Sequence, residues 1–232
     1  MNRIIKLIGL FMIQLSILSC QKDSVGDGKL TYTFKPVNLS ASLSSVSSAS
    51  GQAVSAGSNG SINWTTGRFN VHQIELSGKK DGTSISIEHK DLTDVDILKL
   101  GTISGTVTLP VGTYKDIEVK LKFAISDTKR PLTLVGKFIE TSGTQIPVEV
   151  HFNETLVLQK NVSSISINGD KYTADIILEV NNLVKNLTLS DFGQTTRGTN
   201  GSIFVSNTVN TALYNKLKAN LSLVPAVTIT RQ

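Results

Sequence analysis

Acidic side chains offer the first candidate for chemistry in this chain. Asp91, Asp94 and Asp96 place three carboxylates within six residues. Calcium takes six or more oxygen ligands, and a loop rich in carboxylates can supply some of them. The surrounding sequence has neither the central glycine nor the closing glutamate of a calcium-binding loop. Two interpretations therefore stand: a calcium site, or acids that cap a turn and stay solvated.

The three histidines, His72, His89 and His151, are candidates for metal binding or acid–base chemistry. None of them has the spacing to another histidine or to a glutamate that zinc enzymes use. The alternation around His151 places it on the polar face of a strand, together with Glu149 and Asn153. We expect surface or sheet histidines and predict neither a zinc centre nor a cofactor.

Nucleophilic catalysis finds little support in the sequence. No serine lies in a Gly-x-Ser-x-Gly turn, and the segment Gly101-Thr102-Ile103-Ser104-Gly105 has its serine one position too late for that motif. Carboxylate pairs for glycoside hydrolysis cannot be assigned from spacing, because sheets bring distant residues together. We therefore predict that the protein is not an enzyme.

Trp64, the only tryptophan, is the candidate for ligand binding. An exposed tryptophan would give a sugar ring a platform on which to stack. A buried one would belong to the core, and we favour this position in a chain with only 6% aromatic residues.

Cys20, the only cysteine, follows a segment with the features of a secretory signal. Arg3 and Lys6 give residues 1–19 a positive start, and an apolar stretch covers 7–18. That stretch is too short for a permanent membrane-spanning helix. A single cysteine also excludes an internal disulfide framework and a zinc site built from cysteine pairs.

The sequence Ile17-Leu18-Ser19-Cys20 resembles a bacterial lipobox. The resemblance implies a diacylated Cys20, cleavage before it, and a lipid anchor in the outer membrane. An ordinary secretion signal with a free thiol is the alternative. Gln21-Lys22-Asp23 is similar to the export tag of Bacteroidota-type surface lipoproteins, which implies a domain facing the cell exterior. Residues 20–29 are then a lipidated tether.

Composition narrows the class of protein further. The chain has 232 residues, of which 39% are hydrophobic and 18% charged, so we exclude a wholly disordered chain and a multi-span membrane protein. It carries 23 basic and 18 acidic residues, but two of the basic ones lie in the signal. The lysines are scattered and not interleaved with aromatic residues, so we predict no nucleic-acid partner.

The remaining sequence predicts one domain, residues 30–232, made of short strands. Apolar residues alternate with polar ones over 117–125, 148–152 and 172–180, which is typical of half-buried strands. The apolar phase slips between Phe69 and Leu76, so we predict a β-bulge near His72-Gln73.

Two further segments have distinct patterns. Residues 40–61 are rich in serine, and we predict a disordered loop there. Apolar residues at three- and four-residue intervals predict a helix over 209–221, with Asn207 or Thr208 as N-cap. Residues 224–230 predict a last strand, and Pro225 favours an edge position for it.

The block Leu109-Pro110-Val111-Gly112-Thr113-Tyr114 leads into an alternating strand. With Trp64 and the segments 69–76 and 96–100, it resembles a domain-of-unknown-function family of bacterial surface lipoproteins with a Pro-x-Gly-x-Tyr turn. The resemblance covers roughly residues 30–183 and implies an immunoglobulin- or transthyretin-like β-sandwich. It implies no catalytic residues. We expect Tyr114 to pack its ring over the end of the sandwich while its hydroxyl reaches the backbone.

The expected fold class is therefore all-β: an antiparallel two-sheet β-sandwich with one short C-terminal helix. The expected function is a non-catalytic, lipid-anchored adhesion or binding module at the cell surface. The alternative is a glycan- or nutrient-capture accessory lipoprotein of an outer-membrane uptake system. Under either function, the protein's partners would be the membrane, through the lipid, and a glycan or protein ligand.

Overall fold

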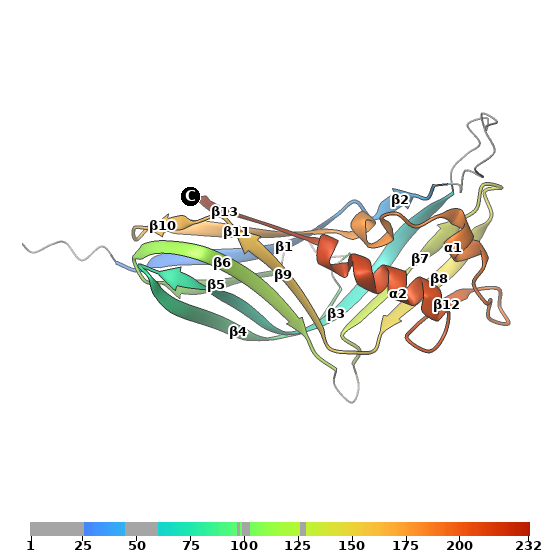
Figure 1. The fold of residues 1–232 in the computed structure, drawn as a ribbon, viewed down its shortest axis with the longest axis horizontal. Helices are drawn as coiled ribbons and strands as arrows, with labels where there is room; N and C mark the ends of the chain where they lie inside the picture. Colours follow the sequence, from blue (N-terminus) through green and yellow to red (C-terminus); the bar gives the residue numbers. More distant parts are fainter. Residues whose placement is uncertain (1–25, 45–59, 97, 99–102, 126–128) are drawn as a thin grey trace, which may run out of the picture.

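The computed structural model describes residues 26–44, 60–96, 98, 103–125 and 129–232, and the side chains of these residues except 89–96 and 103–104. The chain is mostly β-structure in two sheets, with few helices, as the alternating patterns predict (Figure 1). Cys20 and the signal and tether residues before 26 lie outside the described part.

The smaller sheet, sheet A, has the strand order β13-β11-β1-β5. Its strands are β1 (Gly28–Val37), β5 (Ile103–Leu109), β11 (Lys171–Glu179) and β13 (Pro225–Arg231). β13 lies at the edge, so the position expected from Pro225 is confirmed.

The expected antiparallel pairing holds for most strand pairs but not for two of them. β1 runs parallel to β11, and β12 (Ile203–Val205) runs parallel to β8 (Gln145–Phe152). Parallel neighbours need a long crossover, which is usually a helix. Here the chain between β1 and β11 forms β5 of sheet A and most strands of the other sheet, so the crossover leaves no helical pattern in the sequence.

The larger sheet, sheet B, has the order β10-β6-β3-β7-β8-β12, with β2 and β4 also paired to β3 and β9 to β6. Its remaining strands are β2 (Ser40–Ser42), β3 (Ser61–Lys80), β4 (Thr83–Asp96), β6 (Gly112–Phe123), β7 (Leu132–Ile139), β9 (Leu156–Val162) and β10 (Ile165–Ile167). β3 is 20 residues long and pairs with β7 through its first half and with β4 and β6 through its second.

The long strand β3 carries the predicted β-bulge. Its register against β6 shifts between Val71 and Gln73, which confirms the expected position. A second shift against β7, between Trp64 and Thr66, has no counterpart in the prediction. Each extra residue moves the inward-facing side chains from odd to even positions or the reverse. The apolar residues of β3 therefore face the core on both sides of each shift.

The two halves of sheet B are covered differently. Sheet A packs over the half that contains the end of β3, and the apolar side chains of β1 and β11 meet those of β3 and β6 there. The other half is covered by helices (Figure 1). These helical segments are η1 (Val180–Val184), α1 (Leu189–Gly193), α2 (Thr211–Asn220) and η2 (Leu221–Leu223).

Aromatic pairs fix the helical cover to sheet B. Phe138 of β7 stacks on Phe192 of α1, with ring centroids 5.1 Å apart. Phe152 of β8 packs against Tyr214 of α2 at 5.4 Å. The predicted C-terminal helix is thus present, and its apolar face covers the sheet.

The N-cap of α2 differs from the expectation. It is Asn210, in a left-handed conformation with φ 52°, and not Asn207 or Thr208. The Asn210 side chain donates to the carbonyls of Thr196 (3.0 Å) and Phe204 (2.7 Å) and accepts from the Thr196 amide (2.8 Å). These bonds tie the loop before α2 to two earlier segments, which a local pattern cannot reveal.

The two ends of the serine-rich interval, residues 40–61, belong to strands β2 and β3. Ser40–Ser42 forms strand β2 against Asn63, Ile62 and Ser61, and Leu43 is completely buried. The predicted disordered loop at 40–61 is therefore wrong at these positions. The backbone groups at the start of β3 can pair with any sequence, serine included. Residues 45–59 lie outside the described residues.

Candidate functional site

Trp64 belongs to the core and offers no binding platform. Its side chain is 1% exposed and lies over Gly136, its cross-strand partner on β7. The buried position that we favoured is confirmed, and the sugar-stacking alternative for Trp64 is excluded.

Asp91, Asp94 and Asp96 lie on strand β4 and not on a loop. The backbone of Asp96 is opposite Arg68 of β3. The side chains of the three acids lie outside the described side chains, so a calcium site and solvated acids both stay open as interpretations. Among the side chains that are described, no three His, Cys, Asp or Glu residues gather as a metal site would require.

The Pro110–Tyr114 turn has the expected geometry. Tyr114 is fully buried, and its hydroxyl donates to the Pro110 carbonyl at 2.7 Å. Burial, with the nearby carboxylates of Asp27 and Asp81, raises the pKa of Tyr114 above its usual value. Its role is structural: it closes the corner where β5 turns into β6.

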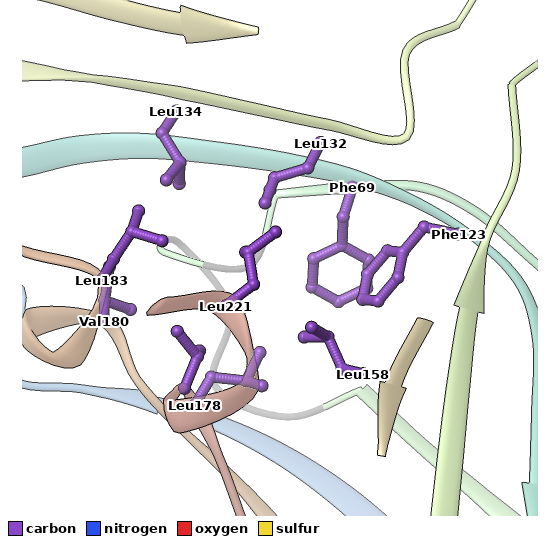
Figure 2. A pocket seen from close by; sticks show the side chains of 10 residues that line it. Phe69, Phe123, Leu132, Leu134, Leu158, Leu178, Val180, Leu183 and Leu221 are labelled. Atoms are coloured by element: carbon purple, nitrogen blue, oxygen red, sulfur yellow. The ribbon is translucent and has the colours of Figure 1, made fainter. Parts of the chain in front are cut away.

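An apolar cavity lies where the two halves of the core meet (Figure 2). Phe69 and Phe123 point into it from sheet B, and Leu183 and Leu221 point into it from the helical cover. Its volume is about 30 Å³, and all the residues that line it are apolar. A space of this size could hold at most one water, which would find no polar partner there. We regard it as a packing gap.

A larger and polar hollow lies across β3, β7 and β8. We call it the His151 pocket and define it by Arg68, Lys129, Arg130, Thr133, Glu149 and His151. Its volume is about 340 Å³, and Phe69 and Asn70 complete its lining. This is the lower end of the range for ligand pockets, roughly 300–1,000 Å³.

Strand register brings the row of side chains in this pocket together. Arg68 of β3 is opposite Thr133 of β7, and Thr133 is opposite His151 of β8. Because neighbours in register share a face of the sheet, the three side chains form one row across three strands. They come from positions 68, 133 and 151, so no local sequence motif could predict that they lie together.

A buried asparagine, Asn70, bonds to residues that lie on either side of Lys129 and Arg130 in the sequence. Asn70 donates from its side chain to the Ala124 carbonyl (2.9 Å) and from its backbone to the Pro131 carbonyl (2.9 Å). Its own carbonyl accepts from the Ala124 amide at 3.2 Å. Asn70 therefore fixes both ends of the segment that carries Lys129 and Arg130.

His151 is as deeply buried as Asn70 among the polar residues that line the pocket, and both are 7% exposed. Its Nε2 contacts the Glu149 carboxylate, and its ring meets the edge of Phe204 on β12, with centroids 4.7 Å apart. Nδ1 is buried and has no hydrogen-bond partner among the described residues. The ring is thus held on two sides and orients Glu149, which stays half exposed.

Cationic side chains outnumber carboxylates around the hollow. Arg68, Lys129 and Arg130 line it, with Glu149 as the acidic residue among its lining side chains. Arg130 is oriented by a 3.1 Å bond from its Nε to Asn153 Oδ1. The outward-facing row Glu149, His151 and Asn153 was predictable from alternation along β8, but the two arginines were missed because they lie on other elements.

The other two histidines lie on the paired strands β3 and β4. His72 is exposed on β3, and the side chain of His89 lies outside the described side chains.

The longest helix, α2, has 10 residues, and the described part of the chain contains no helix suited to spanning a bilayer.

Comparisons with known proteins add no relative. The chain matches no family model, no curated protein sequence and no solved structure.

Proposed function

We propose that the chain is a non-catalytic, lipid-anchored binding module displayed on the cell surface, where it acts in adhesion. The observation that supports this most directly is the lipobox at Cys20, placed only a few residues before β1. β1 begins at the end of the molecule away from α1 and α2 (Figure 1). A lipid on Cys20 would therefore hold that end near the membrane.

The position of the His151 pocket fits such an orientation. The turn after β3 lies at the same end of the molecule as the start of β1. Gly28, at the start of β1, pairs with Leu109, the last residue of β5. Asp81, in the turn after β3, bonds to Thr113, which follows β5 closely in the sequence. Arg68 lies twelve residues before Lys80 on β3, which is roughly 40 Å at about 3.3 Å per residue. An anchored molecule would thus carry the pocket well above the bilayer.

Within this proposal, the domain is an immunoglobulin- or transthyretin-like sandwich where sheet A faces sheet B. Two facing sheets and the buried corner tyrosine, Tyr114, support this assignment. The helical cover over the first half of β3 is an addition to such a sandwich.

A second candidate function, glycan or nutrient capture for an outer-membrane uptake system, is favoured by one observation. The His151 pocket is a polar hollow large enough for a small ligand, and hydrogen bonds hold the side chains of Asn70 and Arg130 in its lining before any ligand arrives. Adhesion alone does not require such a hollow.

Protease treatment of intact cells tests the surface location. We expect the wild-type protein to be cut on intact cells, as completely as after lysis, while a periplasmic marker stays intact. Protection on intact cells with cleavage after lysis would place the domain in the periplasm and contradict the proposal.

The Cys20→Ser variant tests the anchor. Without the sulfur that would carry the diacylglycerol, we expect the protein to move from the detergent phase to the aqueous phase or to accumulate as an uncleaved precursor. The mass of the wild-type N-terminal peptide is the direct readout. A peptide that begins elsewhere, or at Cys20 without acyl mass, would contradict lipidation.

A further inference from the structure

The His151 pocket has a chemistry that points to one class of ligand. Two guanidinium groups and one ammonium group line a hollow of about 340 Å³. A guanidinium binds a carboxylate or a sulfate through two parallel hydrogen bonds, so arginines select planar or tetrahedral anions by geometry as well as charge.

The arginines reach the pocket from different elements, and one of them is already oriented. Arg130 donates from Nε to Asn153, and its two Nη groups contact no hydrogen-bond acceptor among the described residues. Arg68 comes from β3, where its backbone is opposite that of Asp96. An anion between the two arginines could therefore receive donors from two directions, which fixes its position.

The other polar groups of the pocket suit hydroxyl groups. His151 holds the Glu149 carboxylate in place, and a carboxylate accepts hydrogen bonds from hydroxyl donors. The Thr133 side chain lies between Arg68 and His151 in the strand register and can both donate and accept. Anion-binding donors beside hydroxyl-binding groups are the combination that an acidic sugar requires.

We infer that the His151 pocket binds an acidic saccharide, with the anionic group held by Arg68 and Arg130 and a ring hydroxyl held by Glu149. This inference rests on the proposed capture function and names its substrate class. His151 acts as a positioning residue, because it orients Glu149.

Calorimetric titration of the mature lipidated protein in detergent tests the inference. The probes are a hexuronic acid trisaccharide, its fully methyl-esterified form, which keeps the sugar but loses the charge, and sodium sulfate. We expect the acid to bind at least tenfold more tightly than the ester, and more tightly than sulfate. Arg68→Gln and Arg130→Gln should each weaken binding of the acid at least tenfold.

Arg197→Gln is the matched control, because Arg197 pairs with Glu140 outside the pocket and should leave the affinity unchanged. Unaltered circular dichroism spectra would show that the variants fold. Glu149→Gln should weaken binding of the acidic trisaccharide but should not weaken binding of sulfate, which separates the hydroxyl contact from the anion contact.

Three results would overturn the inference: equal affinity for acid and ester, wild-type affinity in both arginine variants, or no binding of any probe. Sulfate binding as tight as that of the trisaccharide would overturn the saccharide assignment and leave a simple anion site. Protease cleavage on intact cells is independent of these results, so a protein found at the surface that binds no acidic saccharide would refute this inference alone.

Discussion

Two glycines of the sheets lie beneath aromatic rings of neighbouring strands. A Cβ at Gly136 would lie 2.4 Å from the Asn63 carbonyl oxygen and 2.9 Å from Cε3 of Trp64. A Cβ at Gly105 would lie 1.9 Å from the hydroxyl of Tyr32, its register partner. Glycine inside a strand often marks such a close approach. The missing side chains at these positions leave room for the rings of Trp64 and Tyr32.

We predict that Gly136→Ala lowers the free energy of unfolding by about 1–3 kcal/mol, because the added methyl group overpacks the core beside a backbone carbonyl. Urea unfolding measures the loss. Gly193→Ala is the control: its Cβ would meet no atom within 4 Å outside its own helix, so stability should stay equal or rise slightly. Equal stabilities of both variants and wild type would contradict the proposed close contact.

The hydroxyl of Tyr114 gives a second test at the residue scale. We predict that Tyr114→Phe lowers the free energy of unfolding by about 1–3 kcal/mol, because the Pro110 carbonyl loses its donor. Tyr114→Ala should cost more, about 3–5 kcal/mol, because it also removes the buried ring. Chemical unfolding of both variants separates the hydroxyl from the ring. A Phe variant as stable as wild type would show that the corner bond contributes nothing.

At the scale of elements, ion pairs reinforce the apolar contacts of the helical cover. Glu154, between β8 and β9, accepts from the Tyr214 hydroxyl (2.5 Å) and from the Lys218 ammonium (2.7 Å) of α2. Lys216 of α2 donates to Asp191 of α1 at 2.5 Å. These contacts attach α2 both to the sheet and to α1.

The same contacts shift the acidity of the two carboxyl groups. The hydrogen bonds from Lys218 and Tyr214 hold the pKa of Glu154 below its usual value. For Asp191, burial opposes ionisation, but bonds from Lys216 and Thr188 outweigh it and lower the pKa. Both carboxylates therefore stabilise the fold while they are ionised.

We predict that Glu154→Gln is less stable than wild type at pH 7 and that the difference shrinks in acid. The folded-state pKa of Glu154 is below the unfolded value of 4.5. Its contribution is therefore complete above about pH 4.5 and is lost as the pH falls through the folded-state pKa. Urea unfolding at pH 7 and near pH 3 measures both differences.

The matched control for this test is Glu140→Gln. Glu140 lies 3.7 Å from Arg197 at the surface, and an exposed pair of this kind contributes little. A Glu154→Gln variant with the same deficit at both pH values would contradict a role for the charge.

At the scale of the whole molecule, one continuous core joins the two halves. The core residues run from Leu30 of sheet A through Phe69 of β3 to Leu217 of α2. β3 lies in both halves, so neither the sheet-on-sheet part nor the sheet-on-helix part can lose its packing without disturbing the same strand.

Buried tyrosines lie in both halves of the molecule. Burial raises the pKa of Tyr32 in sheet A. Burial, together with the bond to Glu154, raises the pKa of Tyr214 in α2. Burial and two carboxylates also raise the pKa of Tyr114. In each case the folded state holds the phenolic proton more tightly than the unfolded chain.

We predict that the free energy of unfolding changes little between pH 8 and about pH 10, the unfolded value for tyrosine, and falls steadily above it. The sign follows because the folded state binds more protons than the unfolded state in this range. Stability measured by urea unfolding between pH 8 and 11 (roughly one unit or more either side of the tyrosine pKa) tests this. Tyrosinate absorbance that rises well before any loss of stability would contradict the prediction.

The sequence by itself determined the local features of this protein. Alternation predicted the strands now seen as β6, β8 and β11, and the change of phase located the bulge at Val71–Gln73. The spacing of apolar residues predicted α2, and the turn residues predicted the corner at Tyr114. Each of these rests on side chains within a few positions of one another, so a local pattern carries it.

Only the tertiary structure decided how distant segments pair. Three features depend on which strand edges and sheet faces other elements leave open. They are the parallel pairing of β1 with β11, the strand at Ser40–Ser42, and the packing of α1 on sheet B. The same reason applies to the candidate site. Alternation placed His151 beside Glu149, but Arg68 and Thr133 join them through the register of three strands, and backbone hydrogen bonds set that register across long sequence distances.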